Sequence, residues 1–325
     1  MHNNEQSVKH ILQHCGSLVS GESIVIICDP STRDLAKLFK QQADAITRKA
    51  TLQEMPIAKT HGQEPPVGIK EAMLSVNLIL SLCKFSLAHS QARIDAGKKG
   101  ARFLSLPLYD WELLSDPAIT FDFKSQAPIV RFVTDAFTNG KIATVTTDNG
   151  TGITLSIDGR IGNYCPGFVD DTSLLGSPPD IESNVSPVED KSDGTVVVDG
   201  SITCPEIGLL TSQVTFTVRN GRITNFASDN KEYVNILDKM FGEKDSKRRV
   251  LAECGVGLNP AAKLTGTMLT DEGAMGCMHF GFGSNYTVGG KNKVDFHLDF
   301  VFKQTSLFVD GEPIIINGEI NERLN

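Results

Sequence analysis

Residues 294–302, VDFHLDFVF, alternate between apolar and polar side chains. A period of two is typical of a half-buried β-strand. Because residues two apart on a strand point the same way, His297 and Asp299 are predicted to project together while the aromatic side chains face a core. Taken alone, this nitrogen and oxygen fit a bound cation no better than they fit an Asp299 that only orients His297, or two solvated side chains.

The glycine-rich segment before this strand contains further candidate ligands. It reads AECGVGLNP from residue 252 and TDEGAMGCMHFGFGSNYTVGG from residue 270, and it supplies Glu253, His279 and Tyr286. Its glycines allow the backbone to turn sharply and to approach a ligand closely. Beside Glu253 and His279, the pair on the strand is best interpreted as part of a metal site, and a metal site indicates an enzyme.

The order of the predicted elements indicates a mixed α/β fold (α+β) with two domains. Strands alternate with helices in the first part, with a strand at 22–28 and another at 100–107, which predicts a mostly parallel sheet. Asn-Gly at 149–150 predicts a hairpin, and similar turns recur towards the end of the chain. We therefore expect an α/β domain over 1–140 and a β-rich domain carrying the metal site over 141–325. The stretch 173–187 is predicted to be a loop, and 232–241 and 245–253 to be helices.

Composition excludes several classes of protein. The 325 residues carry a net charge of −8, which argues against a nucleic-acid partner. Seven scattered cysteines without a CxxC pair indicate reduced thiols. The amino terminus lacks an apolar signal region, and apolar runs are too short to span a bilayer. A cytoplasmic protein without a membrane partner is expected.

The order of these motifs resembles the M29 metallopeptidases, the aminopeptidase T family. An AE-x-G-x-G-x-NP segment matches 252–260, a DE-x-x-x-G-x-x-H segment matches 271–279, GG-x-N matches 289–292, and H-x-D matches 297–299. A further family glutamate aligns with Glu182, although it follows isoleucine here where the family has glycine. The same scaffold includes dioxygenases that open dihydroxypyridine rings.

The resemblance implies a two-metal aminopeptidase acting on small peptides. It implies two divalent ions (Zn, Co or Mn), a homodimer, and a set of six metal ligands: Glu182, Glu253, His279, Tyr286, His297 and Asp299. We assign catalytic roles to Glu253, Tyr286 and Glu272, and the other interpretation of Glu272 is a turn residue. A metal-bound water would attack the peptide bond.

The alternative is a mononuclear non-haem Fe(II) dioxygenase that cleaves a hydroxylated pyridine-type ring. His279, His297 and Asp299 would then form the two-histidine, one-carboxylate face typical of such enzymes. Glu182 and Glu253 are extra carboxylates that this site does not need, so they favour the aminopeptidase. A non-catalytic binding protein is disfavoured, because unused ligands would leave uncompensated buried charge.

Overall fold

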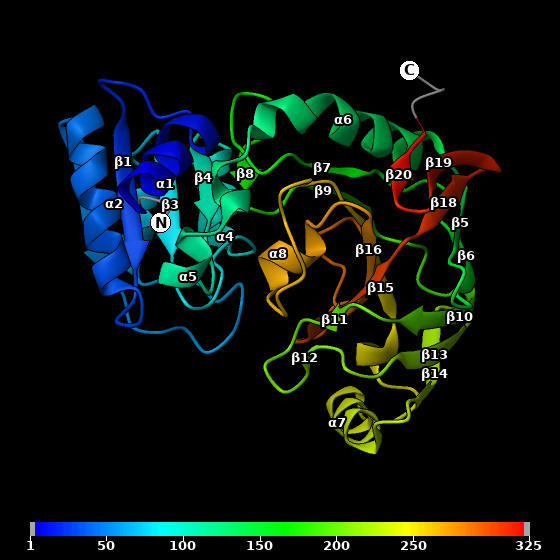
Figure 1. Ribbon diagram of the computed structural model, residues 1–325. Coiled ribbons are helices and arrows are strands. Elements are labelled where there is room, and N and C mark those ends of the chain that lie inside the picture. Colours follow the sequence, from blue (N-terminus) through cyan, green and yellow to red (C-terminus); the bar gives the residue numbers. More distant parts are fainter. Residues whose placement is uncertain (1–3, 322–325) are drawn as a thin grey trace. The chain divides into compact units, whose positions relative to one another are not determined.

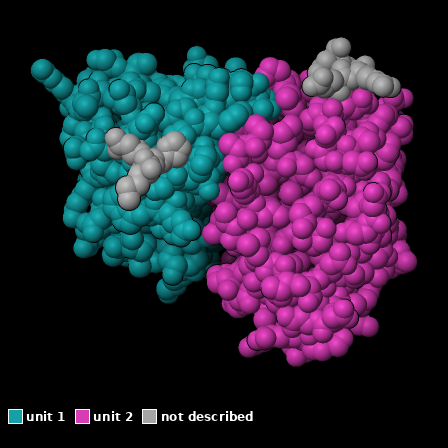
Figure 2. Space-filling view, viewed as in Figure 1, with its two compact units in different colours: residues 1–126, 165–179 teal, residues 127–164, 180–325 magenta. Residues whose placement is uncertain are grey.

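The computed structural model describes residues 4–321, and the chain divides into two compact units (Figures 1 and 2). Unit 1 comprises residues 1–126 and 165–179, and unit 2 comprises 127–164 and 180–325. The sequence-based division into 1–140 and 141–325 treated each part as one continuous segment. The predicted fold class, with a parallel α/β region and an antiparallel β-rich region, is confirmed. Across residues 4–321, no helix has the length and apolar character needed to cross a membrane.

Unit 1 is built on a parallel five-stranded sheet in the order β2-β1-β3-β4-β8. Its interior strand β1, SIVIIC, is rich in β-branched residues and is buried on both faces, as expected for a covered parallel sheet. The strands are β1 (Ser23–Cys28), β2 (Lys49–Glu54), β3 (Leu78–Leu82), β4 (Arg102–Ser105) and β8 (Leu175–Gly176). The helices are α1 (Asn4–His10), α2 (Arg33–Ile46), α3 (Val67–Met73), α4 (Gln91–Gly97) and α5 (Trp111–Leu114), with short π and 3-10 turns at Ile11–Cys15 and Pro117–Thr120.

Unit 2 contains two antiparallel sheets (Figure 1). The eight-stranded sheet runs β14-β13-β10-β6-β5-β18-β19-β20, and its strands are β5 (Ile142–Thr146), β6 (Gly152–Ser156), β10 (Ser192–Val198), β13 (Val214–Arg219), β14 (Arg222–Ala227), β18 (Ser306–Val309), β19 (Glu312–Ile316) and β20 (Glu319–Ile320). The seven-stranded sheet runs β12-β11-β17-β16-β15-β9-β7, and its strands are β7 (Asn163–Cys165), β9 (Glu182–Val185), β11 (Ser201–Ile202), β12 (Gly208–Leu209), β15 (Leu251–Gly257), β16 (Cys277–Gly283) and β17 (His297–Lys303).

Helix α7 (Lys231–Phe241) confirms the helix predicted at 232–241. The Asn230 side chain accepts a hydrogen bond from the amide of Glu232 and so caps the first turn. Gly242, with φ of 65°, ends the helix in a conformation that other residues rarely adopt. The other helices associated with this unit are α6 (Phe123–Asn139), which begins in unit 1, and α8 (Met268–Glu272).

Two local predictions are wrong. Residues 245–253 do not form a helix, because a 3-10 turn at Lys247–Arg249 leads directly into β15. The stretch 173–187 is not a loop throughout, because it contains β8 and β9. In both places, pairing with distant strands decides the conformation, and local composition does not report that pairing.

An aromatic cluster joins the two sheets of unit 2. The ring of Phe216 on β13 lies 5.3 Å from Phe282 on β16 and 5.1 Å from Phe300 on β17, both centroid to centroid. All three side chains are fully buried. The cluster occupies one face of β16 and β17, so the alternate residues of these strands, including His279 and Asp299, lie on the other face.

We expect Phe216→Ala to lower the free energy of unfolding by about 3–5 kcal/mol, because it opens a cavity at the centre of this cluster. Urea denaturation measures the change. Ile161→Ala is the control, since Ile161 is 73% exposed and its loss should cost within about 0.5 kcal/mol. Equal destabilisation by the two variants would contradict the assignment of the core.

Candidate metal centre

Five of the six candidate ligands, all except Tyr286, share one face of four neighbouring strands, β9, β15, β16 and β17. Residues that lie directly opposite on antiparallel strands have side chains on the same face. Each of the five lies opposite a glycine: Glu182 opposite Gly257, Glu253 opposite Gly281, His279 opposite Gly255, His297 opposite Gly283 and Asp299 opposite Gly281. The glycines leave space on this face for the ligand side chains.

The glycines are required for steric reasons. A Cβ atom added at Gly255 would lie 2.1 Å from the imidazole ring of His279. A Cβ atom at Gly281 would lie 2.6 Å from Nε2 of His297 and 2.7 Å from Oδ1 of Asp299. Distances below 3.0 Å force atoms to move, so any other residue at these positions would displace the imidazoles and the carboxylate.

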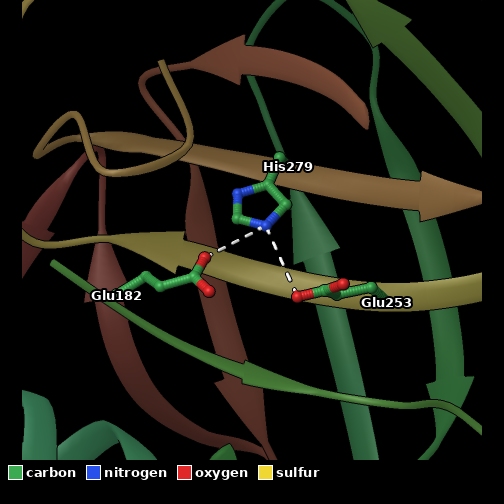
Figure 3. Close-up of side chains that lie close together, drawn as sticks. All are labelled: Glu182, Glu253 and His279. Atoms are coloured by element: carbon green, nitrogen blue, oxygen red, sulfur yellow. Dashed lines mark ion pairs between the residues drawn. The ribbon is translucent and has the colours of Figure 1, made fainter. Parts of the chain in front are cut away.

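Glu182, Glu253 and His279 form the first candidate ligand group, with all three side chains buried. Nε2 of His279 lies 3.3 Å from Oε2 of Glu182 and 3.9 Å from Oε1 of Glu253. Figure 3 shows the two carboxylates pointing to the same ring nitrogen from two different strands. The ligand atoms of the group lie within 4.8 Å of one another, a spacing that could hold a metal ion.

Glu253, His297 and Asp299 form the second group, so the two groups share Glu253. Nε2 of His297 lies 3.3 Å from Oε2 of Glu253 and 3.2 Å from Oδ1 of Asp299. The other ring nitrogen, Nδ1, lies 2.9 Å from the carbonyl oxygen of Ser284. Since a carbonyl only accepts, Nδ1 carries the proton, and Nε2 is the nitrogen that can bind a metal.

Burial and charge pull the pKa values of the first group in different directions. Burial raises the pKa of Glu182 to about 7, although His279 partly offsets it. Burial alone would lower the pKa of His279, but the interaction with Glu253 and the charge of Glu182 outweigh it and raise that pKa to about 9. The pKa of Glu253 is lowered despite its burial, because its interactions with the two imidazoles favour the charged carboxylate.

Two further carboxyl groups adjoin these ligands. Burial and the neighbouring carboxylates raise the pKa of Asp180 well above its usual range, and burial with the charge of Asp299 does the same for Glu272. Oδ1 of Asp180 and Oε1 of Glu272 are buried and have no hydrogen-bond partner within the described residues. Unpaired buried oxygens are costly, so they indicate that a cation belongs in this region.

The donor set fits a divalent metal ion of borderline hardness. Throughout residues 4–321, no lysine or arginine forms an ion pair with Glu182, Glu253 or Asp299, so two imidazoles are the only cationic groups paired with three buried carboxylates. Carboxylate and imidazole donors suit Fe, Mn, Co or Zn, and no cysteine belongs to either group.

The remaining predicted residues are placed differently. Tyr286 lies on the loop between β16 and β17, where it is 61% exposed and Nζ of Lys293 stands 5.2 Å from its ring. Its assignment as a ligand stays a prediction. Glu272 ends α8 and interacts with Asp299, and its catalytic role likewise stays a prediction.

Sequence reasoning missed Asp180 and Asn184, which flank Glu182. A detectable signal exists, because Asp180, Glu182 and Asn184 alternate in DIESN as His297 and Asp299 alternate in HLD. The prolines before this stretch concealed the pattern by suggesting a loop.

The fold and the buried nitrogen and oxygen donors define a two-unit protein with a candidate metal centre. Residues 5–322 match the model of the family described as NicX, 2,5-dihydroxypyridine 5,6-dioxygenase, and the chain belongs to this family. A curated relative, 2,5-dihydroxypyridine 5,6-dioxygenase from Pseudomonas putida (strain KT2440), is 29% identical over 145 residues. That alignment spans 41% of this chain and 41% of the relative's length.

Two solved structures show the same fold. The structure of 2,5-dihydroxypyridine dioxygenase from Pseudomonas putida KT2440 aligns with a TM-score of 0.84 at 18% identity, over 98% of this chain and 97% of that one. Wild-type AmpT from Thermus thermophilus aligns with a TM-score of 0.65 at 12% identity, over 98% of both chains. The predicted resemblance to the aminopeptidase T family therefore holds at the level of the scaffold.

The predicted activity is wrong. The family match and the curated relative overturn the metallo-aminopeptidase, and with it the hydrolase and metalloprotease class. The physical reason is that a fold does not determine a reaction, and glutamate, histidine and aspartate suit more than one metal chemistry. The motifs therefore identified the scaffold and could not distinguish the reactions that it supports.

Gly255→Ala should weaken metal binding by about tenfold or more, because the added Cβ displaces the His279 imidazole. Metal affinity is measured by competition with a chromophoric chelator. Gly152→Ala on β6 is the matched control, since nothing lies within 4 Å of the added atom. Unchanged affinity in the folded Gly255 variant would contradict the assignment of His279 as a ligand.

Metal binding at pH 7 should release at least about one proton per ion. With a pKa of about 9, the His279 imidazole is protonated at pH 7 in the metal-free protein, and a metal ligand must be neutral. Raising the pH from 6 to 8 should therefore strengthen binding. Calorimetry in buffers of different ionisation enthalpy measures the release, and a binding enthalpy that is independent of the buffer would refute it.

Proposed function

We propose that this protein is a non-haem Fe(II)-dependent dioxygenase that opens the ring of a hydroxylated pyridine, with 2,5-dihydroxypyridine as the first compound to test. Membership of the dioxygenase family supports the reaction class. The observation that carries the proposal is the presence of two imidazoles and a carboxylate on one sheet face, where glycines keep the space around them open. Two histidines and one carboxylate are the ligand set typical of non-haem Fe(II) oxygenases.

The proposed iron ligands are His279, His297 and Asp299. Iron held by these three residues would leave open positions for substrate and dioxygen and would supply the redox chemistry between them. Glu253 lies between the two imidazoles, with Oε1 3.9 Å from Nε2 of His279 and Oε2 3.3 Å from Nε2 of His297, so it would help to orient both rings. The His297 side chain is 33% exposed, which leaves one side of the site accessible to a small molecule.

The extra carboxylates need no second metal under this proposal. Burial raises the pKa values of Asp180 and Glu272 well above the usual range, which favours their neutral forms. One Fe(II) would then offset two of the three negative charges of Glu182, Glu253 and Asp299, because the imidazoles that bind it are neutral.

The test is oxygen uptake by the Fe(II)-loaded protein with 2,5-dihydroxypyridine. We expect one O₂ to be consumed for each ring opened, and the loss of ring absorbance measures the ring opening. Asp299→Ala should reduce kcat by more than about 100-fold. This is a larger loss of activity than is typical when a residue that only orients a metal ligand is removed.

Asp158→Ala is the control for that variant, because Asp158 is an exposed turn residue with the same side chain. It should leave oxygen uptake unchanged. Ring loss without oxygen uptake, or full activity in the Asp299 variant, would reject the proposed reaction.

A further inference from the structure

A chain of side-chain amides leads away from the candidate ligand Glu182. Nδ2 of Asn184 donates to Oε1 of Glu182 at 2.7 Å, and both residues lie on the same face of β9. Nδ2 of Asn163, on β7, donates to Oδ1 of Asn184 at 2.7 Å and to the carbonyl oxygen of Val288 at 3.2 Å. Asn184 is only 3% exposed, so its amide is held in a fixed environment.

The chain of amides has a single possible direction. Glu182 is ionised when it binds a metal, and an ionised carboxylate only accepts hydrogen bonds, so Asn184 must turn its NH₂ group towards it. Its oxygen therefore faces Asn163, which must donate in turn. The carbonyl of Val288 also only accepts, and this fixes the orientation of the Asn163 amide from the other end.

This arrangement divides the two oxygens of Glu182 between two tasks. Oε1 is occupied by the Asn184 amide. Oε2 is buried, has no hydrogen-bond partner within residues 4–321, and faces Nε2 of His279 at 3.3 Å. One oxygen is thus held by the protein, and the other is left for a cation.

The far end of the chain is a loop that also contacts the second imidazole. Val288 belongs to the loop over 284–296, and the carbonyl of Ser284 at its start accepts from His297. Glu189 fixes this loop, because it accepts from the amide of Lys291 at 2.6 Å and from Nδ2 of Asn285 at 3.1 Å. One loop therefore supports groups on opposite sides of the site.

We propose that Asn163 and Asn184 are positioning residues that hold Glu182 as a ligand through Oε2 alone and tie its orientation to the loop over 284–296. The inference rests on the proposed metal site and adds Glu182 to the groups that contact the ion. Residues that orient metal ligands typically contribute 10–100-fold to metal affinity.

Asn163→Asp gives the sharpest test, because the chain of amides and simple charge attraction predict opposite changes in Fe(II) affinity. The new carboxylate cannot donate, so the Asn184 amide would reverse and present its oxygen to Glu182. If the chain of amides orients Glu182, Fe(II) binding should weaken by about tenfold, although Asn163 does not contact a ligand. Simple charge attraction predicts tighter binding of the cation.

Asn184→Leu removes the donor without adding charge and should weaken Fe(II) binding by about 10–100-fold. Affinities are measured anaerobically by chelator competition, together with the melting temperature of each metal-free variant. Asn225→Asp, at an exposed position of β14, is the control for the added charge.

Weaker Fe(II) binding by the Asn163→Asp and Asn184→Leu variants, with the affinity of the control unchanged, supports the positioning role of the two asparagines. Unchanged or tighter binding in Asn163→Asp overturns it, as does a lower melting temperature with unchanged affinity. If Asn184→Leu does not fold, the Asn163→Asp result decides. Failure of the wild-type protein to bind Fe(II) or to consume oxygen counts against the proposed function and is seen before any variant is compared.

Discussion

The candidate metal centre depends on a steric constraint in the seven-stranded sheet: each bulky ligand side chain lies opposite a glycine. The register places Gly255 against His279 and Gly281 against Asp299. Without these glycines, His279, His297 and Asp299 could not keep their positions on this sheet face, since an added Cβ atom would overlap both rings and the carboxylate. On the reverse face, the packed phenylalanines keep the strands in this register, because slipping by one residue would exchange the two faces.

The concentration of buried carboxylates gives this sheet face its chemistry. Glu253 is central, because it contacts both imidazoles and belongs to both candidate ligand groups. Contacts outside the ligands then fix their orientation, with the Ser284 carbonyl on His297 and the Asn184 amide on Glu182. A metal bound here would therefore meet donors that are already oriented, which lowers the entropic cost of binding.

The sequence predicted those parts of the site that depend on local periodicity. Alternation in HLD placed His297 and Asp299 on one face of a strand, and the structure brings Oδ1 of Asp299 within 3.2 Å of the ring. Strand β9 is predicted to be a loop, because the prolines on either side of it and its polar residues conceal its pairing with β15, which lies far along the chain. The pairing of ligands with glycines is likewise non-local, since it exists only once the register is fixed. The reaction could not be predicted, because Glu182 and Glu253 fit either one metal or two.

The most direct test of the central claim is the metal content of the protein purified without oxygen, measured by elemental analysis. We predict about one iron per chain, held by the histidines and carboxylates of the sheet face. The same measurement on His279→Ala should show iron lost from the folded protein. About two zinc ions per chain, or iron retained in that variant, would contradict the account.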